Sequence, residues 1–269
     1  MPYFKYMAAF ASDKFLDDQT VRFCQPNEYN DPFELIPEIR LKEELSLPSK
    51  NLGIDLSGGK PQFEEYEILE SELSDYKYHL NSNLVTEVSK LVGCTCFSYS
   101  EASIPVNLLM WAHYAESHKG IAIQLKDRSA LIQDMSPVVY RKRRPIINGK
   151  YLSESEVISM RDLYVKSDHW EYESEYRLSR RLEDCSEVSD GIFVSKISPC
   201  DIERIVLGVN AAPELREKAF KFYKQHNIQV ILTRRASSGF GFEPSTVFGA
   251  EYSDAVSITE WYRYESAQT

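Results

Sequence analysis

The segment WEYESEYRLSRRL (170–182) alternates aromatic or aliphatic residues with charged ones. In an extended strand every second side chain faces the same side, so this period of two predicts a strand with one charged face, at least over its second half. The residues expected on that face are Glu171, Glu173, Glu175 and Arg177.

The rest of the chain supplies more strands, with helices between them. Apolar and β-branched runs predict strands at 2–10, 20–26, 93–100, 119–126, 137–143, 193–197, 203–209 and 228–235. Apolar residues at helical intervals predict helices at 64–92, 106–117, 153–167 and 213–227. No glycine-rich phosphate loop follows a strand, which argues against a doubly wound nucleotide-binding sheet. The sequence therefore predicts an α+β fold around a mixed or antiparallel central sheet with helical insertions.

The domain boundaries follow from the same pattern. We expect a single α+β domain over residues 1–235, with a helical insertion at about 40–92. The tail, residues 236–269, has little periodicity and is expected to be a C-terminal extension.

Composition narrows the function classes. With 31 Lys and Arg against 41 Asp and Glu, the net charge of −10 argues against broad electrostatic capture of nucleic acid. The run RKRR (141–144) still leaves open a local phosphate or nucleic-acid contact, or simply a basic surface patch. Five cysteines without disulfide or zinc-site spacing indicate thiols in a reducing compartment and no structural metal. Neither a secretion signal nor an apolar run of ~20 residues is present, so we expect a cytoplasmic protein that makes no membrane contact.

The turn NEYNDPFE (27–34) concentrates acids and amides directly after a predicted strand. Asn30 and Asp31 precede Pro32, which disfavours helix and fixes the local chain. Such a turn can present amide and carboxylate groups to a polar ligand. The structural interpretation, in which both side chains bond to their own backbone, is favoured on spacing alone.

The helix predicted around MWAHY (110–114) gathers aromatic side chains next to a histidine. Trp111, His113 and Tyr114 could stack on a planar ring such as nicotinamide or a base. A stripe of this kind at helical spacing more often belongs to the hydrophobic core, and this interpretation is favoured.

The carboxylates of the 170–182 strand are the third candidate cluster. Two acids that lie two positions apart can divide catalytic work, one stabilising a developing cation while the other activates a nucleophile. The alternative is a solvated edge strand in which Arg177 and Arg180 act as counterions.

Several short motifs occur in a characteristic order. They are FKY (4–6), NDPFE (30–34), MWAHY (110–114) with Gly120, WEYESEYR (170–177) and IVLG (205–208). In this order the chain resembles the bacterial family of domain of unknown function 2971, from about residue 3 to 235. Members of that family look linked to phage-defence loci, so the resemblance implies an antiviral role.

The order of elements also resembles ADP-ribosyltransferases of the DarT kind, which implies a fold of that kind and NAD as substrate. In that resemblance Glu175 holds the nicotinamide ribose and supports the oxocarbenium-like transition state, while Glu173 activates the acceptor. Tyr6 falls near the NAD amide, where such enzymes usually carry His or Arg, and Trp111 or Tyr114 stacks on nicotinamide. Further candidates for NAD contact are Asn30, Asp31, His113 and Arg177.

Three hypotheses remain open at this point. The first is a toxin-like effector of abortive infection that consumes NAD as an ADP-ribosyltransferase or a glycohydrolase. The second is a non-catalytic sensor or adaptor that binds a nucleotide or a phage component, with nucleic acid or a protein of the same defence system as its partner. The third is a nuclease with Mg²⁺ held by Asp31, Glu34, Glu173 and Glu175.

Overall fold

The computed structural model describes residues 2–40, 78, 82–102, 104–148 and 163–248. It divides the chain into two compact units. The first unit contains Met1–Cys24, Val92–Val138 and His169–Thr269, and the second contains Gln25–Leu91 and Val139–Asp168. The sequence pattern predicts one domain with an insertion at about 40–92. The second unit includes that stretch and also residues that follow the 110–114 helix in the chain, Val139–Asp168.

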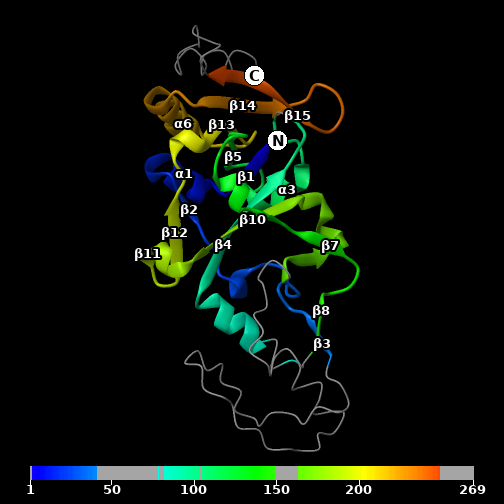
Figure 1. Cartoon of the computed structure of the whole chain (residues 1–269). Coiled ribbons are helices and arrows are strands. Elements are labelled where there is room, and N and C mark those ends of the chain that lie inside the picture. The colour runs from blue at the N-terminus through cyan, green and yellow to red at the C-terminus, as the bar shows by residue number, and fades with distance from the viewer. Residues whose placement is uncertain (1, 41–77, 79–81, 103, 149–162, 249–269) are drawn as a thin grey trace, which may run out of the picture. The chain divides into compact units, whose positions relative to one another are not determined.

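Within the described residues, an eight-stranded mixed sheet forms the centre of the first unit (Figure 1). Its strands, in spatial order, are β15 (Phe242–Phe248), β14 (Gln229–Arg235), β13 (Ile202–Leu207), β5 (Ile121–Leu125), β1 (Tyr3–Met7), β4 (Val92–Tyr99), β10 (Glu175–Arg181) and β6 (Ser136–Pro137). Only β13 and β14 run parallel, because helix α6 connects them; the other neighbours are antiparallel. The predicted α+β class with a mixed sheet is therefore confirmed.

Strand β15 lies in the segment that the sequence analysis treated as an extension. It pairs with β14 from Arg235↔Phe242 to Val230↔Phe248 and forms one edge of the sheet. Pro244 hides the strand from sequence patterns, but an edge strand tolerates proline because its outward N–H groups need no partner. The first unit therefore continues past residue 235.

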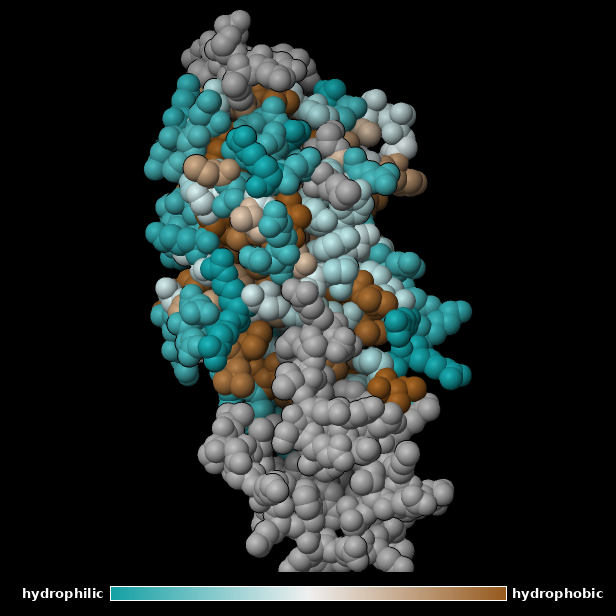
Figure 2. All heavy atoms as spheres, in the orientation of Figure 1, coloured by the Kyte–Doolittle hydropathy of each residue, from teal (hydrophilic) through white to brown (hydrophobic). Residues whose placement is uncertain are grey.

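Helices cover both faces of the sheet. One face packs against α1 (Ala9–Asp18) and α6 (Pro213–His226), whose Phe15 and Phe222 are almost fully buried in the larger core. The other face packs against α3 (Leu108–Tyr114) through Met110 and Trp111. Figure 2 shows mainly hydrophilic residues over the outer sides of α1 and α6, as expected for amphipathic helices. Among the described helices, none is both long and apolar enough to cross a membrane.

The end of α6 matches its sequence signal closely. Asn227 caps the helix in the left-handed conformation with φ 52°, and its N–H donates to the Tyr223 carbonyl at 2.8 Å. Pro213 stands at the first helical position, where its missing N–H costs nothing. The helix therefore occupies the predicted span 213–227 to within a residue.

Smaller sheets complete the described structure. In the first unit β2 (Thr20–Arg22), β12 (Ile192–Lys196) and β11 (Ser186–Ser189) form an antiparallel ribbon. In the second unit the parallel pairs are β3 (Glu38–Arg40) with β8 (Ile146–Asn148) and β7 (Val139–Arg141) with β9 (Val165–Ser167). The strand predicted at 137–143 is thus split between β6 and β7. Of the helix predicted at 153–167, residues 153–162 lie outside the described residues. Its last three residues, Val165–Ser167, form strand β9 and not a helix. Of the helix predicted at 64–92, residues 82–89 are described and are helical.

The ladder between β1 and β4 is unusually short. The two strands pair only at Tyr3↔Tyr99 and Phe4↔Ser98, whereas β4 pairs with β10 over seven residues. Beyond Phe4 the ammonium of Lys5 approaches the carbonyl oxygen of Cys96 at 3.5 Å. Next to the end of the ladder, the Lys5 side chain therefore contacts the backbone of β4 at Cys96.

Candidate functional site

Glu175 and Arg177 form a buried ion pair at the start of β10. Arg177 donates from Nε to Glu175 Oε1 at 2.7 Å and from Nη2 to Oε2 at 3.1 Å. The residues are only 6% and 2% exposed, respectively, so the pair is part of the interior and not a solvated edge. Because the two residues are separated by one position in a strand, both side chains project from the same face of the sheet. The guanidinium compensates the carboxylate charge where water cannot.

Glu173 does not lie on this strand, and the predicted charged face is wrong in its first half. Residues Asp168–Glu173 form a 3-10 helix, and Ser174 turns the chain into β10 with a left-handed φ of 45°. Glu171 is exposed in consequence. The physical reason is a set of contacts distant in sequence: Asn107 Nδ2 donates to the Tyr172 carbonyl at 2.7 Å, and Ser98 Oγ donates to the Glu173 carbonyl at 2.6 Å.

The side chain of Glu173 is nevertheless close to the aromatic helix. It is 2% exposed, and its Oε1 accepts a short hydrogen bond from the hydroxyl of Tyr114 on α3. Tyr114 is half-buried, so this contact lies nearer to solvent than the ion pair does. The structure thus brings together Glu173, Tyr114 and the segment leading into Glu175.

Trp111 belongs to the hydrophobic core, which is the interpretation favoured by its spacing. The residue is 1% exposed, and its Nε1 donates to the Pro105 carbonyl at 2.7 Å. Tyr6 packs edge-on against its ring at 5.3 Å between centroids, and His118 stacks on it at 6.3 Å. Burial also raises the pKa of the Tyr6 hydroxyl well above its ordinary value. Both rings are therefore part of the hydrophobic core, while His113 on α3 is exposed.

Two groups that the sequence analysis did not select, Lys5 and Cys96, lie next to Glu175. Burial lowers the pKa of the half-buried Lys5 ammonium, although Cys96, Cys24 and Glu175 attract its positive charge. Burial raises the pKa of the Cys96 thiol well above its ordinary value, and the Glu175 carboxylate adds to the rise. Cys96 is the cross-strand neighbour of Arg177.

Three buried polar side chains near the site, those of Gln124, Ser98 and Glu175, lie in a row across the sheet, with the apolar Phe4 between Gln124 and Ser98. Gln124, Phe4, Ser98 and Glu175 occupy matching positions on four adjacent strands, so their side chains share one face. Gln124 Oε1 is buried without a hydrogen-bond partner. A single polar residue in an apolar strand, as in YFKYM (3–7) and IAIQL (121–125), is the sequence signal that could have identified Lys5 and Gln124.

Asn30 and Asp31 belong to the second unit, and the structure does not group them with Glu175. Asn30 is exposed, whereas Asp31 is buried and its Oδ1 accepts from the Phe33 N–H at 2.9 Å. This is the local turn bond that the structural interpretation predicts. Three residues on, Glu34 pairs with Lys166 at 3.7 Å in the interior of the same unit.

The described residues contain no group of three His, Cys, Asp or Glu side chains placed to hold a metal ion. Of the acids proposed for Mg²⁺, Glu34 and Glu175 are each paired with a cation instead.

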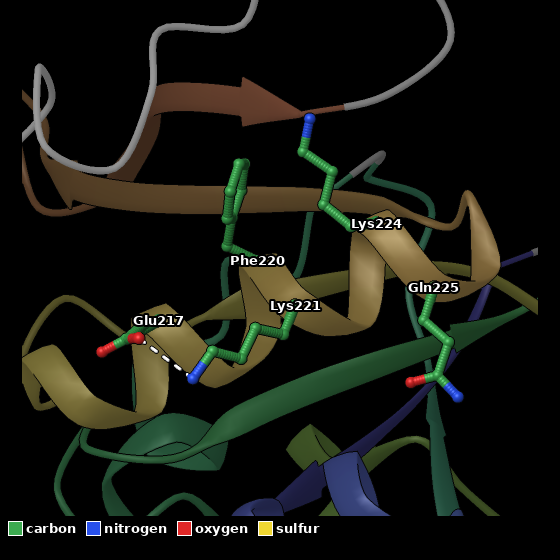
Figure 3. Close-up of a pocket in the computed structure, with 5 residues that line it drawn as sticks. All are labelled: Glu217, Phe220, Lys221, Lys224 and Gln225. Carbon is green, nitrogen blue, oxygen red and sulfur yellow. Dashed lines mark ion pairs between the residues drawn. The ribbon is translucent and has the colours of Figure 1, made fainter.

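A pocket of about 500 Å³ lies on the outer side of α6 (Figure 3). Its lining is Glu217, Phe220, Lys221, Lys224 and Gln225, with an ion pair of 3.0 Å between Lys221 and Glu217. Figure 3 shows Phe220 and Lys224 pointing toward β15, where Phe220 contacts Phe248 with the ring centroids 5.0 Å apart. The helix covers the sheet face opposite to α3, and no candidate residue from the sequence lines this pocket.

A family model matches part of the chain. No curated protein and no solved structure matches the chain significantly. Residues 110–178, which run from the start of the MWAHY motif to just past Arg177, match the family described as "Protein of unknown function (DUF2971)". This match covers α3 from Met110 onward, β5 and the Glu175–Arg177 pair, so this part of the chain is similar to the DUF2971 family.

Proposed function

We propose that this chain cleaves the glycosidic bond of NAD, as an ADP-ribosyltransferase or an NAD glycohydrolase, and that it acts in antiviral defence. The observation that carries the proposal is the buried Glu175 carboxylate, fixed by two hydrogen bonds from Arg177 at the start of β10. The resemblance to DarT-like enzymes supports the choice of NAD, and the resemblance to a family linked with phage-defence loci supports the role.

Glu175 has the chemistry that this reaction requires. Departure of nicotinamide develops positive charge at the anomeric carbon, and a preorganised carboxylate in a low-dielectric site stabilises that charge. The two hydrogen bonds from Arg177 fix the orientation of the Glu175 carboxylate before the substrate binds.

Glu173 would activate the acceptor. Its carboxylate is held in place by the hydrogen bond from the Tyr114 hydroxyl. Tyr114 is the half-buried ring of α3, and in this proposal it contacts nicotinamide. Trp111, whose ring is covered by Tyr6 and His118, would act by positioning α3.

The test is nicotinamide release from NAD by the purified chain. Glu175→Gln keeps the size of the side chain but removes its charge, and should lower the rate by at least ~10². Glu171→Gln is the matched control because Glu171 lies in the same segment and is exposed. Circular dichroism and a urea titration would establish that both variants are folded.

Assays with single-stranded DNA, RNA or neither would identify the acceptor. Stimulation by one of them indicates transfer to that nucleic acid, and equal rates indicate hydrolysis. Release by Glu175→Gln at the wild-type rate would contradict the proposal.

A second candidate is a non-catalytic module that binds a nucleotide or a phage component. The favouring observation is that both oxygens of Glu175 already accept bonds from Arg177, as in a purely structural ion pair. Calorimetry with NAD separates the two candidates: binding without nicotinamide release under any of the conditions above supports the module.

A further inference from the structure

Cys24 and Cys94 face each other across two antiparallel chain segments. The Cys24 N–H donates to the Cys94 carbonyl at 2.9 Å, and the Cys94 N–H donates to the Cys24 carbonyl at 2.8 Å. Residues that exchange both bonds lie on the same face with their Cα atoms about 5.5 Å apart. That separation falls within the range of about 4.4–6.8 Å found for disulfides.

The two thiols differ in how an oxidant can reach them. Cys24 is half-buried, so a small oxidant can reach its sulfur from solvent. Cys94 is 1% exposed, and its Sγ is 3.4 Å from Ser179 Oγ. Cys24 is therefore the first target, and Cys94 is the thiol opposite it.

Cys96 is a poorer partner although it lies two residues further along the same strand. It has no cross-strand pairing with Cys24, and its environment favours the protonated thiol because of burial and the neighbouring Glu175 carboxylate. The dithiol is thus specific to one pair among the three cysteines.

We propose that Cys24 and Cys94 form an oxidisable dithiol that a peroxide converts into a disulfide. The Cys24 thiolate attacks a peroxide oxygen, so that an S–O bond forms and the O–O bond breaks, and the departing hydroxide takes up the proton that the Cys24 thiol had released, giving one water. The Cys94 sulfur then attacks the Cys24 sulfenic acid: the S–S bond forms, the S–O bond breaks, and the Cys94 proton leaves with the hydroxide as a second water. Two thiols are oxidised by two electrons, and one hydrogen peroxide is reduced to two waters.

The geometry makes this disulfide reversible. In a hydrogen-bonded cross-strand pair the Cβ atoms are about 5–5.5 Å apart, while a disulfide holds them at about 3.5–4.5 Å. Oxidation must therefore pull the segments together by about 1 Å, and strained disulfides are more easily reduced. The cross-link would close the chain around residues 25–93, which include the whole first segment of the second unit, Gln25–Leu91.

Peptide mapping of the full chain after titration with hydrogen peroxide tests the proposal. Trypsin places Cys24 in peptide 23–40 but leaves Cys94 and Cys96 together in peptide 91–119, so variants must separate the two. The cross-link should form in wild type and Cys96→Ser and should be lost in Cys94→Ser and Cys24→Ser. Dithiothreitol should release it.

The exposed thiol of Cys200 serves as an internal reference for oxidation. The peroxide concentration is raised until this thiol is oxidised. Reduced Cys24 and Cys94 at that dose would overturn the proposal. A cross-link that persists in Cys94→Ser would overturn it as well, because Cys96 would then be the partner.

Discussion

Each unit of the molecule contains a buried ion pair among its described residues, and these two pairs are built differently. In the first unit Arg177 holds Glu175 through two bonds of 2.7 and 3.1 Å, with the partners only two residues apart. In the second unit Lys166 approaches Glu34 at 3.7 Å, with side chains that are only 4% and 3% exposed and that come from distant parts of the sequence. Both carboxylates belong to motifs that the sequence singled out.

The difference follows from the chemistry of the cations. A guanidinium presents a planar fork that matches both carboxylate oxygens, whereas an ammonium is a compact point charge on a flexible stem. The first pair therefore fixes the direction of its carboxylate, and the second mainly compensates charge. That contrast is why the proposed chemistry is assigned to Glu175 and not to Glu34.

Arg177→Met should give the largest loss of stability. It leaves the Glu175 carboxylate buried without its guanidinium, which typically costs about 3–5 kcal/mol of unfolding free energy. Urea titration measures the loss. The double variant Arg177→Met/Glu175→Gln is the control, because removing the charge should recover most of it. A single variant as stable as wild type would show that the pair contributes no stability.

The local character of the first pair also explains what the sequence could predict. Glu175 and Arg177 are adjacent on one strand face, so a period of two is enough to bring them together, and Arg177 was expected as a counterion. The apolar strands β5 and β13 and the Asn227 helix end were likewise predictable from local patterns.

Features that depend on distant contacts were not predictable. The alternation at 170–174 looked like a strand, but Asn107 and Ser98 hold this segment as a 3-10 helix. The partner of Glu34 is 132 positions away, and no local pattern identifies Lys166. The place of Trp111 in the core was the favoured interpretation, but its contact with the ring of Tyr6, more than 100 positions away, could not be predicted from a local pattern.

Lys166→Met should cost less than Arg177→Met, about 2 kcal/mol, because Glu34 loses one contact of 3.7 Å whereas Glu175 loses two shorter hydrogen bonds. Amide hydrogen exchange would locate the effect, and faster exchange is expected at β7 and β9 of the second unit. Equal acceleration across β4 and β10 would contradict the view that each pair stabilises its own unit.

Arg177→Lys tests whether the two hydrogen bonds from the planar guanidinium are needed, because it keeps the positive charge but removes that group. The charge remains, but the second bond to Glu175 is lost, so a destabilisation of about 1–2 kcal/mol is expected. Under the proposed function, nicotinamide release should fall further than stability does, because the direction of the carboxylate is no longer fixed. If nicotinamide release falls equally in Arg177→Lys and in the exposed control Arg181→Lys, Arg177 does not position the Glu175 carboxylate for the reaction.

The unfolding free energy of the first unit should decrease at acidic pH because of His118. Burial lowers the pKa of His118, with Arg235 adding to the shift, so the unfolded chain binds the proton more tightly than the folded one. Stability should therefore be complete above the unfolded pKa of about 6.5 and decline as the pH falls below it. His118→Phe keeps a ring against Trp111 and should remove this part of the slope. An unchanged slope would assign the decline to other groups.

The smallest loss of stability is expected for an ion pair at the surface, and this loss is the reference against which the buried pairs are compared. Lys218 of α6 contacts Asp13 at 2.7 Å and Asp17 at 2.6 Å on α1, distances as short as those of the Glu175 pair. Both aspartates are more than half exposed, so water competes for every charge. Lys218→Met should therefore cost less than ~1 kcal/mol, and less in high salt. If it cost as much as Arg177→Met, contact distance rather than burial would set the strength of ion pairs in this protein.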